Sequence, residues 1–443
     1  MRPTGIEVPR YEGGVIGLPD RAMVLSNSER RTSWCDRRWL WGYGYGYDTG
    51  SSPAQSFGQH GHDVLEEVFA WWAATDADFP IVGLTDCIWG PAGDHDDCPW
   101  CHGTEKGPVA RIRDTLELDA LQSGDGQEAL VAAIKEGERL YRCLSGYLRF
   151  YGTAPPAMFR ILQPECRIAA PVISPTTGKV YKSLVPVVRE PEGWRLARAT
   201  DLACDITNVM LPWYQIAKLD AVVMHRGNGT LWFYEHKFTK SAGNYARDLA
   251  LDTQVSGYAY VLDHVAKTGY FEHARGFGGF VYDLVSSKMH NDPRVLKSGK
   301  ISTDKRQTIP TWRWDAFFAA NPHMGAADFR DFRDHLQMFV DPSLYVTEWT
   351  TIGPDQIEQY KRELFADAKR LASLYRRLHR SAVTEHGYPR TPLCRGPGYG
   401  CAYTSLCLQD SPEARSQFII RPGLRWVSKD PLPPQKKEFS LWD

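Results

Sequence analysis

The stretch from Ile216 to Thr239 reads IAKLDAVVMHRGNGTLWFYEHKFT. Two short runs rich in β-forming residues flank His225–Thr230, whose Gly and Asn residues are typical of a tight hairpin turn. Asp220 lies in the first run, and Glu235 and Lys237 lie at the end of the second. Because side chains alternate between the faces of a strand, Glu235 and Lys237 share one face. An antiparallel hairpin therefore predicts that Asp220 and Glu235 lie side by side.

Two converging carboxylates repel each other unless a cation lies between them. Hard oxygen ligands of this kind suit Mg²⁺ or Mn²⁺. A lysine beside such an ion, here Lys237, can orient or deprotonate an attacking water and offset the charge of a phosphate. A surface ladder of salt bridges is the alternative interpretation of the same three residues.

The composition bounds the function classes. The chain has 443 residues, with 52 Lys and Arg against 53 Asp and Glu, a formal net charge of −1. Hydrophobic content of 43% excludes a disordered chain, and no apolar run reaches the ~20 residues that a membrane helix needs. The near-zero charge excludes a globally basic nucleic-acid binder, so such a surface must be local. The N-terminal residues lack the apolar stretch of a signal peptide, and we expect a cytoplasmic protein without a membrane partner.

The pattern along the chain predicts a mixed α/β protein. We expect a mixed or antiparallel sheet because β-rich runs, which include PECRIAAPVI, KVYKSLVPVVR and FGGFVYDLV, surround the hairpin. Helical periodicity predicts amphipathic helices near Phe57–Trp72, Gly126–Tyr151 and Asp355–Ala382. The predicted segments are a flexible arm (1–20), an N-terminal helical region (21–160) with an inserted loop (84–107), a core sheet and helix (161–290), a mixed region (291–354), a basic helix with a cysteine triplet (355–410) and an irregular tail (411–443).

Two further patterns accompany the hairpin. His62 lies four residues after Gly58 and four before Glu66 on the early helix, although a lone helical histidine is more often packed or solvated than a ligand. Gln254 and Tyr258 are spaced i and i+4, which puts an amide and a phenol on one helix face. An ordinary polar face is the alternative for this pair.

Taken in order, Gly58, His62, Glu66, Asp220, Glu235, Lys237, Gln254 and Tyr258 give a sequence that resembles the PD-(D/E)xK nuclease superfamily, and within it the RecB-like branch that includes AddB and the Cas4 exonucleases. The resemblance implies a restriction-endonuclease-like core, a mixed central sheet flanked by helices. It also implies that His62, Asp220 and Glu235 hold the divalent metal and that Lys237 is catalytic. Gln254 and Tyr258 would contact DNA, and Glu165 would be an additional acidic metal ligand.

The sequence departs from that family in two places. Ala217 stands where a glycine usually precedes the aspartate by three residues. The segment between Glu165 and Asp220 is also long, which suggests an inserted hairpin.

Cys394, Cys401 and Cys407 are spaced closely enough for their thiolates to converge, and Cys35 is the natural fourth ligand. One early and three late cysteines match the iron–sulfur members of the family. The resemblance thus implies a [4Fe–4S] cluster that joins the N- and C-terminal segments. Zinc bound by the same four thiolates is the alternative.

A second cysteine group forms a candidate zinc site. Cys87 precedes the pair Cys98 and Cys101, and His95 or His102 could supply the fourth ligand. Reduced surface cysteines are the competing interpretation.

Basic residues gather near the candidate cluster. Arg37 and Arg38 alternate with tryptophans, and Lys361–Arg380 holds seven Lys or Arg against two Asp or Glu. Together they resemble a path for single-stranded DNA, with phosphate contacts and stacking platforms. A solvated helix face is the alternative.

These patterns together predict a metal-dependent DNA nuclease, an exonuclease acting on single strands or DNA ends. The chain has no phosphate-binding loop of a motor, so a helicase, recombination or integration partner would be a separate protein. The rivals are an inactive DNA-binding or assembly subunit and a Cas4-like trimming factor of an integration complex. A bacterial or phage origin would fit the resemblance.

Overall fold

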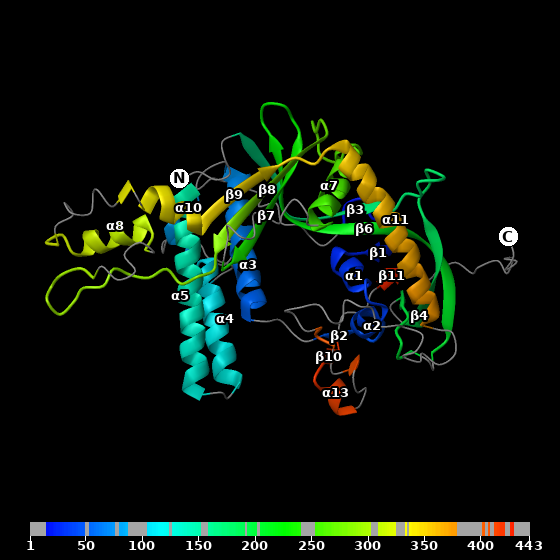
Figure 1. The fold of residues 1–443 in the computed structure, drawn as a ribbon, viewed down its shortest axis with the longest axis horizontal. Helices are drawn as coiled ribbons and strands as arrows, with labels where there is room; N and C mark the ends of the chain where they lie inside the picture. Colours follow the sequence, from blue (N-terminus) through cyan, green and yellow to red (C-terminus); the bar gives the residue numbers. More distant parts are fainter. Residues whose placement is uncertain are drawn as a thin grey trace, which may run out of the picture. The chain divides into compact units, whose positions relative to one another are not determined.

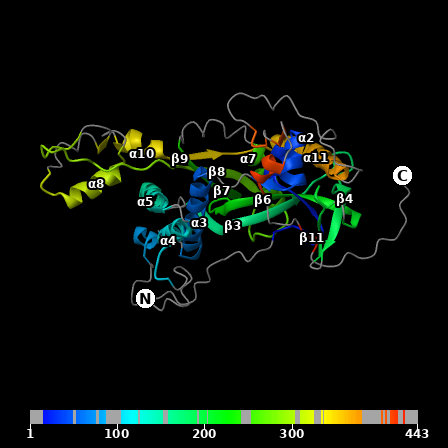
Figure 2. The same ribbon diagram turned by 90° about the horizontal axis from the view of Figure 1, so that it is seen from below.

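The computed structural model describes residues 15–48, 53–75, 79–86, 104–123, 126–151, 158–190, 193–201, 204–240, 253–302, 309–324, 333–334, 336–378, 401–403, 406–407, 412–420 and 426–428. The chain divides into two compact units. The first comprises residues 1–14, 51–166 and 218–352, and the second comprises residues 15–50, 167–217 and 353–443. Figures 1 and 2 show the elements of both units.

The first unit contains the hairpin and the sheet around it. The C-terminal part of β6 (Ile206–His225) pairs antiparallel with β7 (Leu231–Thr239). Strand β7 pairs parallel with β8 (Phe277–Ser286), which pairs antiparallel with β9 (Tyr345–Thr350). The sheet is therefore mixed, as the sequence predicts. Strand β6 begins earlier than the short run suggests, and β9 lies in a region whose pattern predicts no single element.

Helices cover both faces of this sheet. On one face, α3 (Pro53–Thr75) and α5 (Gly126–Tyr151) pack their apolar stripes on residues of β6, β7 and β8. Helix α4 (Pro108–Ser123) runs beside α5 (Figure 1). On the other face lies α7 (Thr253–Ala266), whose Tyr258 ring meets Phe233 edge-on at 5.4 Å. The expected mixed sheet flanked by helices is thus confirmed.

The rest of the first unit consists of short elements. These are the 3₁₀ helix η2 (Ile81–Leu84), α8 (Thr311–Ala320), the π-helical turn η6 (Leu336–Val340) and α10 (Asp341–Leu344). An isolated antiparallel bridge joins Asp86 to Lys106. It closes the base of the expected 84–107 insertion, whose cysteines and histidines lie outside the described residues.

The second unit has its own strands and helices. Strand β4 (Lys182–Glu190) pairs antiparallel with the N-terminal part of β6 and with β5 (Gly193–Leu196), and β11 (Trp426–Ser428) adds to β5. The β4–β5 pair is the inserted hairpin expected from the long segment before Asp220. Strands β1 (Met23–Leu25) and β3 (Phe159–Pro171) also pair with β6. Strands β3 and β6 each contribute residues to both units.

The helices of the second unit are α1 (Asn27–Thr32), α2 (Asp36–Trp39), the π-helical turn η1 (Leu40–Gly44), α11 (Pro354–Arg377) and α13 (Pro412–Ser416). Helix α11 buries Ile357, Tyr360, Leu364 and Leu371, the stripe that the periodicity predicts. Near the ends of the chain, β2 (Tyr47–Asp48) pairs with β10 (Ile419–Ile420). None of the helices in the described parts of the chain is long and apolar enough to cross a bilayer.

Candidate active site

The candidate site lies in the first unit, where β6 and β7 meet below α3. The cross-strand pairing of β6 and β7 ends at Ala221 and Tyr234, the neighbours in sequence of Asp220 and Glu235. Beyond this point the acceptor is a side chain: Asp220 Oδ2 accepts the backbone N–H of His236 at 2.6 Å. The hairpin thus places Asp220 beside Glu235, as the sequence predicts.

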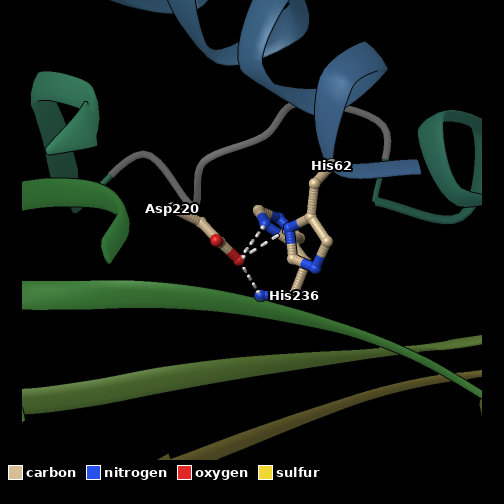
Figure 3. A group of neighbouring side chains, drawn as sticks. All are labelled: His62, Asp220 and His236. Atoms are coloured by element: carbon tan, nitrogen blue, oxygen red, sulfur yellow. Dashed lines mark hydrogen bonds and ion pairs between the residues drawn. The ribbon is translucent and has the colours of Figure 1, made fainter. Parts of the chain in front are cut away.

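Helix α3 brings His62 to the same carboxylate. His62 Nδ1 lies 3.2 Å from Asp220 Oδ2 (Figure 3). The close approach of α3 to β7 depends on Gly61, because a Cβ there would lie 2.3 Å from the ring of Phe238. Gly58, the glycine of the family-like motif, has open space around the same position. Gly61 was therefore the informative glycine, and sequence spacing alone does not distinguish it from Gly58.

Glu235 and Lys237 interact directly on the opposite face of β7. The Lys237 ammonium forms a short ion pair with Glu235 Oε1. The Gln254 amide reaches the same oxygen at 3.5 Å and donates to the Tyr258 hydroxyl at 2.5 Å. The i, i+4 pair on α7 thus shares one face and borders the site. The DNA contact that the resemblance implies for both residues stays a prediction.

His236 is a residue that the sequence analysis missed. Its side chain is 1% exposed, and its Nδ1 lies 3.4 Å from Asp220 Oδ2. Its Nε2 lies 3.3 Å from the Tyr147 hydroxyl, which donates to Asp283 Oδ2 at 2.7 Å. Thr347 donates to the other Asp283 oxygen at 2.7 Å. A buried polar chain therefore supports His236 from behind, and its signal was a histidine among apolar residues on the core face of the strand.

Glu165 lies near the site on β3. Lys218 Nζ contacts its Oε2 at 2.6 Å, and the charge of Asp220 acts on it. Its φ of +44° places it in the left-handed region, where a side chain costs of order 1–3 kcal/mol. Such strain clusters at functional sites, which is consistent with the expected additional acidic ligand.

The environment of the site lowers the pKa of Asp220 and raises the pKa values of Glu235 and Glu165. Burial would raise the pKa of Asp220, but the charge of His62 and hydrogen bonds from His236 and His62 outweigh it and hold the pKa well below its usual range. Burial and the neighbouring charge of Asp220 raise the pKa of Glu235 to about 7 against the opposing Lys237. Burial would lower the pKa of His62, but Asp220 raises it overall. Burial raises the pKa of Glu165 despite Lys218.

The donor set fits a divalent cation. Among the described residues, His62, Asp220 and His236 each place one potential ligand atom within 4.8 Å of the others. Glu235 Oε2 is buried and has no hydrogen-bond partner in the described part of the chain. A buried carboxylate oxygen without a donor is costly unless a cation satisfies it. Carboxylate oxygens and imidazole nitrogens together suit Mn²⁺ and its neighbours as well as Mg²⁺.

Comparison with known families decides the identity of the fold. A model of the PD-(D/E)XK nuclease superfamily matches residues 30–408. The chain belongs to the PD-(D/E)XK nuclease superfamily. Comparison with curated proteins gave no significant match. As a superfamily nuclease, the protein acts on nucleic acid with a divalent metal, and the match spans His62, the β6–β7 hairpin and α7.

In this nuclease, the described cysteines of the expected cluster all belong to the second unit. Cys35 is buried at the start of α2, while Cys401 and Cys407 pack on the aromatic cluster of Trp41, Tyr47 and Tyr403. The Tyr403 hydroxyl donates to the Tyr47 carbonyl at 2.9 Å. The early and late cysteine-bearing segments therefore pack on a shared core, and Cys394 lies outside the described residues.

The cysteine group expected to bind a second zinc, Cys87, His95, Cys98, Cys101 and His102, also lies outside the described residues. Its base is the Asp86–Lys106 bridge. The second zinc thus stays a prediction.

Several of the basic side chains of the second unit form ion pairs with acidic side chains of the same unit. Arg30 contacts Asp367 at 2.7 Å, and Asp36 accepts from Arg370 and Arg377 at 2.9 and 2.8 Å. Arg37 is 8% exposed, whereas Arg38 is exposed. Solvent therefore reaches Arg38 rather than Arg37 of the two arginines expected to contact DNA. Because Arg37 is buried, its side chain does not reach a phosphate at the surface in this conformation.

Proposed function

We propose that this superfamily member is a deoxyribonuclease that hydrolyses phosphodiester bonds of single-stranded DNA or of DNA ends as an exonuclease. The observations that support it best are the His62–Asp220 contact at 3.2 Å, the Lys237–Glu235 ion pair and the buried Glu235 Oε2, which has no donor among the described residues. His62, Asp220 and Glu235 would hold Mg²⁺ or Mn²⁺, and Glu165 or His236 would complete the ligand set.

The charge state of each residue determines the role we assign to it. A bound divalent ion would supply Lewis acidity that activates water and polarises the phosphate. Asp220 is ionised throughout the neutral range because its pKa is lowered. Lys237, held against Glu235 by an ion pair, can donate a hydrogen bond to the attacking water or to a phosphate oxygen. Gln254 lies 3.5 Å from that Glu235 oxygen and donates to the Tyr258 hydroxyl, and both residues would border the path of the strand.

The experiment is cleavage of end-labelled single- and double-stranded DNA with Mg²⁺, Mn²⁺ or a chelator. Lys237→Ala should lower the rate by about 10²–10⁴-fold, the usual value of a positioned acid–base group. Lys240→Ala is the matched control, because Lys240 is exposed three residues further along the chain. Equal rates for the two variants would show that the cleavage does not depend on this site. Intact DNA with both metals would exclude the proposed activity. Such a result would favour the inactive DNA-binding subunit.

The iron–sulfur proposal rests on a separate observation. Cys401 and Cys407 pack on the aromatic core that also contains Trp41, six residues after Cys35. One early and three late cysteines would be brought together by such packing, and close cysteines of this kind can hold an iron–sulfur cluster. We therefore favour a cluster held by Cys35, Cys394, Cys401 and Cys407. It would have a structural role, as in the Cas4-like exonucleases that the sequence resembles.

A further inference from the structure

A pocket of about 510 Å³ lies in the first unit, outside the carboxylate site. Its walls come from the end of α5, from α8, from the η6–α10 turn and from the first residue of β9, elements that lie together in Figure 1. The volume falls in the range of ~300–1,000 Å³ that is usual for small-ligand sites. Nothing described above requires this pocket.

The pocket is built around a glycine. A Cβ on Gly146 would lie 1.8 Å from the Tyr345 hydroxyl and 2.9 Å from Trp312 Nε1. Gly146 therefore lets two aromatic side chains approach the surface of α5. Trp312 Nε1 is a buried donor with no acceptor among the described residues. The site thus combines a close backbone approach with an indole donor that finds no acceptor among the described residues.

Aromatic rings supply flat apolar surface in the pocket. Phe150 is 39% exposed, and its ring lies 5.3 Å from that of Tyr345 at a tilt of 32°. The Arg149 guanidinium lies 5.5 Å from the centre of the Trp312 ring. Phe and Trp faces and guanidinium planes are the groups on which unpaired nucleobases stack.

The charges of the lining favour a base over a phosphate. Arg149 and Arg333 are balanced by Asp315 and Asp341, so the lining has no net positive charge. Arg333 is paired with Asp315 through two contacts of 3.0 Å, and Asp341 accepts the Thr311 N–H at 3.0 Å. A phosphate would meet these carboxylates, whereas a base edge presents both donors and acceptors.

The pocket lies at the end of the sheet where the catalytic strand ends. Lys237 pairs with Leu284 of β8, and Val285, the next residue, pairs with Tyr345 of β9. One strand therefore separates the two, which corresponds to about 10 Å laterally. Tyr345 belongs to the core on the α5 face, the face from which His62 reaches Asp220, whereas Glu235 and Lys237 face α7. A strand bound at the site would therefore pass around the end of β8 to reach the pocket.

We propose that this pocket binds one nucleobase of the single-stranded substrate, a short distance along the strand from the bond that is cleaved. The proposal deepens the function proposed above and rests on it for the identity of the strand. Stacking on Trp312 or Phe150 provides the affinity. The arginine and aspartate side chains read polar groups on the base edge.

The test measures binding without cleavage. Fluorescein-labelled single-stranded oligodeoxynucleotides, each with one abasic residue at a different position, are titrated with wild-type protein in a chelator. One position, or two adjacent ones, should bind about tenfold more weakly than the intact strand. Trp312→Ala should weaken binding of the intact strand similarly and abolish the sensitivity to that position, because the two changes remove the same contact. Trp312→Phe should restore the sensitivity.

Further variants keep the result interpretable. Phe150→Ala tests the same pocket if Trp312→Ala fails to fold, as judged by circular dichroism. Phe339→Ala is the matched control, since Phe339 is 60% exposed on η6 and does not line the pocket. A uniform abasic profile, or a profile unchanged in both pocket variants, overturns the proposal.

The outcomes separate the two proposals. Metal-dependent cleavage with a uniform abasic profile would support the nuclease function and contradict base binding in the pocket. A position-specific profile in a protein that cleaves no DNA would support base binding in the pocket and contradict the nuclease activity. Photocrosslinking from 5-iodouracil at the sensitive position should map to Trp312, Phe150 or Tyr345, and mapping to another surface would contradict the assignment.

Discussion

The Asp220 carboxylate accepts the backbone N–H of His236 at 2.6 Å, and the same oxygen lies 3.4 Å from the imidazole of that residue. One oxygen thus completes the strand pairing and faces two histidines. The acid expected to hold the metal also fixes the separation of β6 and β7. Its structural and chemical roles can be separated by substitution.

Asp220→Asn and Asp220→Ala should differ in stability but not in function. The amide oxygen of Asn can still accept the His236 N–H, whereas Ala leaves that buried donor without a partner. Ala should therefore lower the free energy of unfolding by about 1–3 kcal/mol more than Asn. Both should abolish the rise in melting temperature that Mn²⁺ gives the wild type. Equal unfolding free energies in urea would contradict the bridging role of the carboxylate.

Gly61→Ala and Gly58→Ala form a matched pair on α3. At Gly61 the new methyl group meets the Phe238 ring, so α3 and the strand bearing Lys237 must move apart. We expect a loss of about 1–3 kcal/mol in stability and reduced cleavage. At Gly58 the space is open, and Ala should stabilise the helix by up to about 1 kcal/mol. Chemical denaturation of both variants measures this, and similar effects would rule out the tight contact.

Cys401→Ser should remove the colour of the protein. If Cys35, Cys394, Cys401 and Cys407 bind an iron–sulfur cluster, anaerobically purified wild type is brown with a broad visible absorption. The serine variant should lose that absorption and most of its iron. Cys204→Ser is the control, because Cys204 is exposed. A colourless wild type with stoichiometric zinc would select the alternative metal.

His290 should make the protein sensitive to mild acid. Burial, with the charges of Arg313 and Arg142, lowers its pKa to about 4. An unfolded histidine titrates near 6.5, so the unfolded chain binds more protons between these values. Stability from the neutral ring is therefore complete above about pH 6.5 and is lost as the pH falls towards 4, by up to about 3 kcal/mol.

Unfolding free energies measured from pH 8 to pH 4 check this expectation. His290→Phe should flatten the decline relative to wild type. His323→Gln, a change at an exposed histidine, should leave it unchanged. If the two variants decline alike, His290 is not the source of the acid sensitivity.

The sequence predicts the elements whose signals are local. The turn residues between Asp220 and Glu235, the period-two alternation of β7 and the apolar stripe of α11 all depend on neighbours along the chain. Ser26 caps α1 through an equally local contact, because its side chain accepts the Glu29 N–H. The proximity of Asp220 and Glu235 follows from the hairpin alone.

The remaining features depend on contacts between distant segments. His236 faces the core, away from Glu235 and Lys237, and only the end of strand pairing brings its ring to Asp220. The importance of Gly61 depends on Phe238, 177 positions later in the chain. The internal pairing of Asp36 with Arg370 likewise removes charge from a helix whose sequence looks like a binding surface.

The pairing of Tyr47 with Tyr403 and of β2 with β10 has a consequence for the order of folding. Once Ile352 has left the ribosome, every strand and helix of the first unit has been synthesised. The second unit still lacks α11, Cys401 and Cys407, so its early segments must wait for the last hundred residues or so. Because contacts between such distant segments form slowly, the nuclease unit is expected to fold first during translation. The cysteine-bearing unit would close only after Cys407 and β10 have been synthesised.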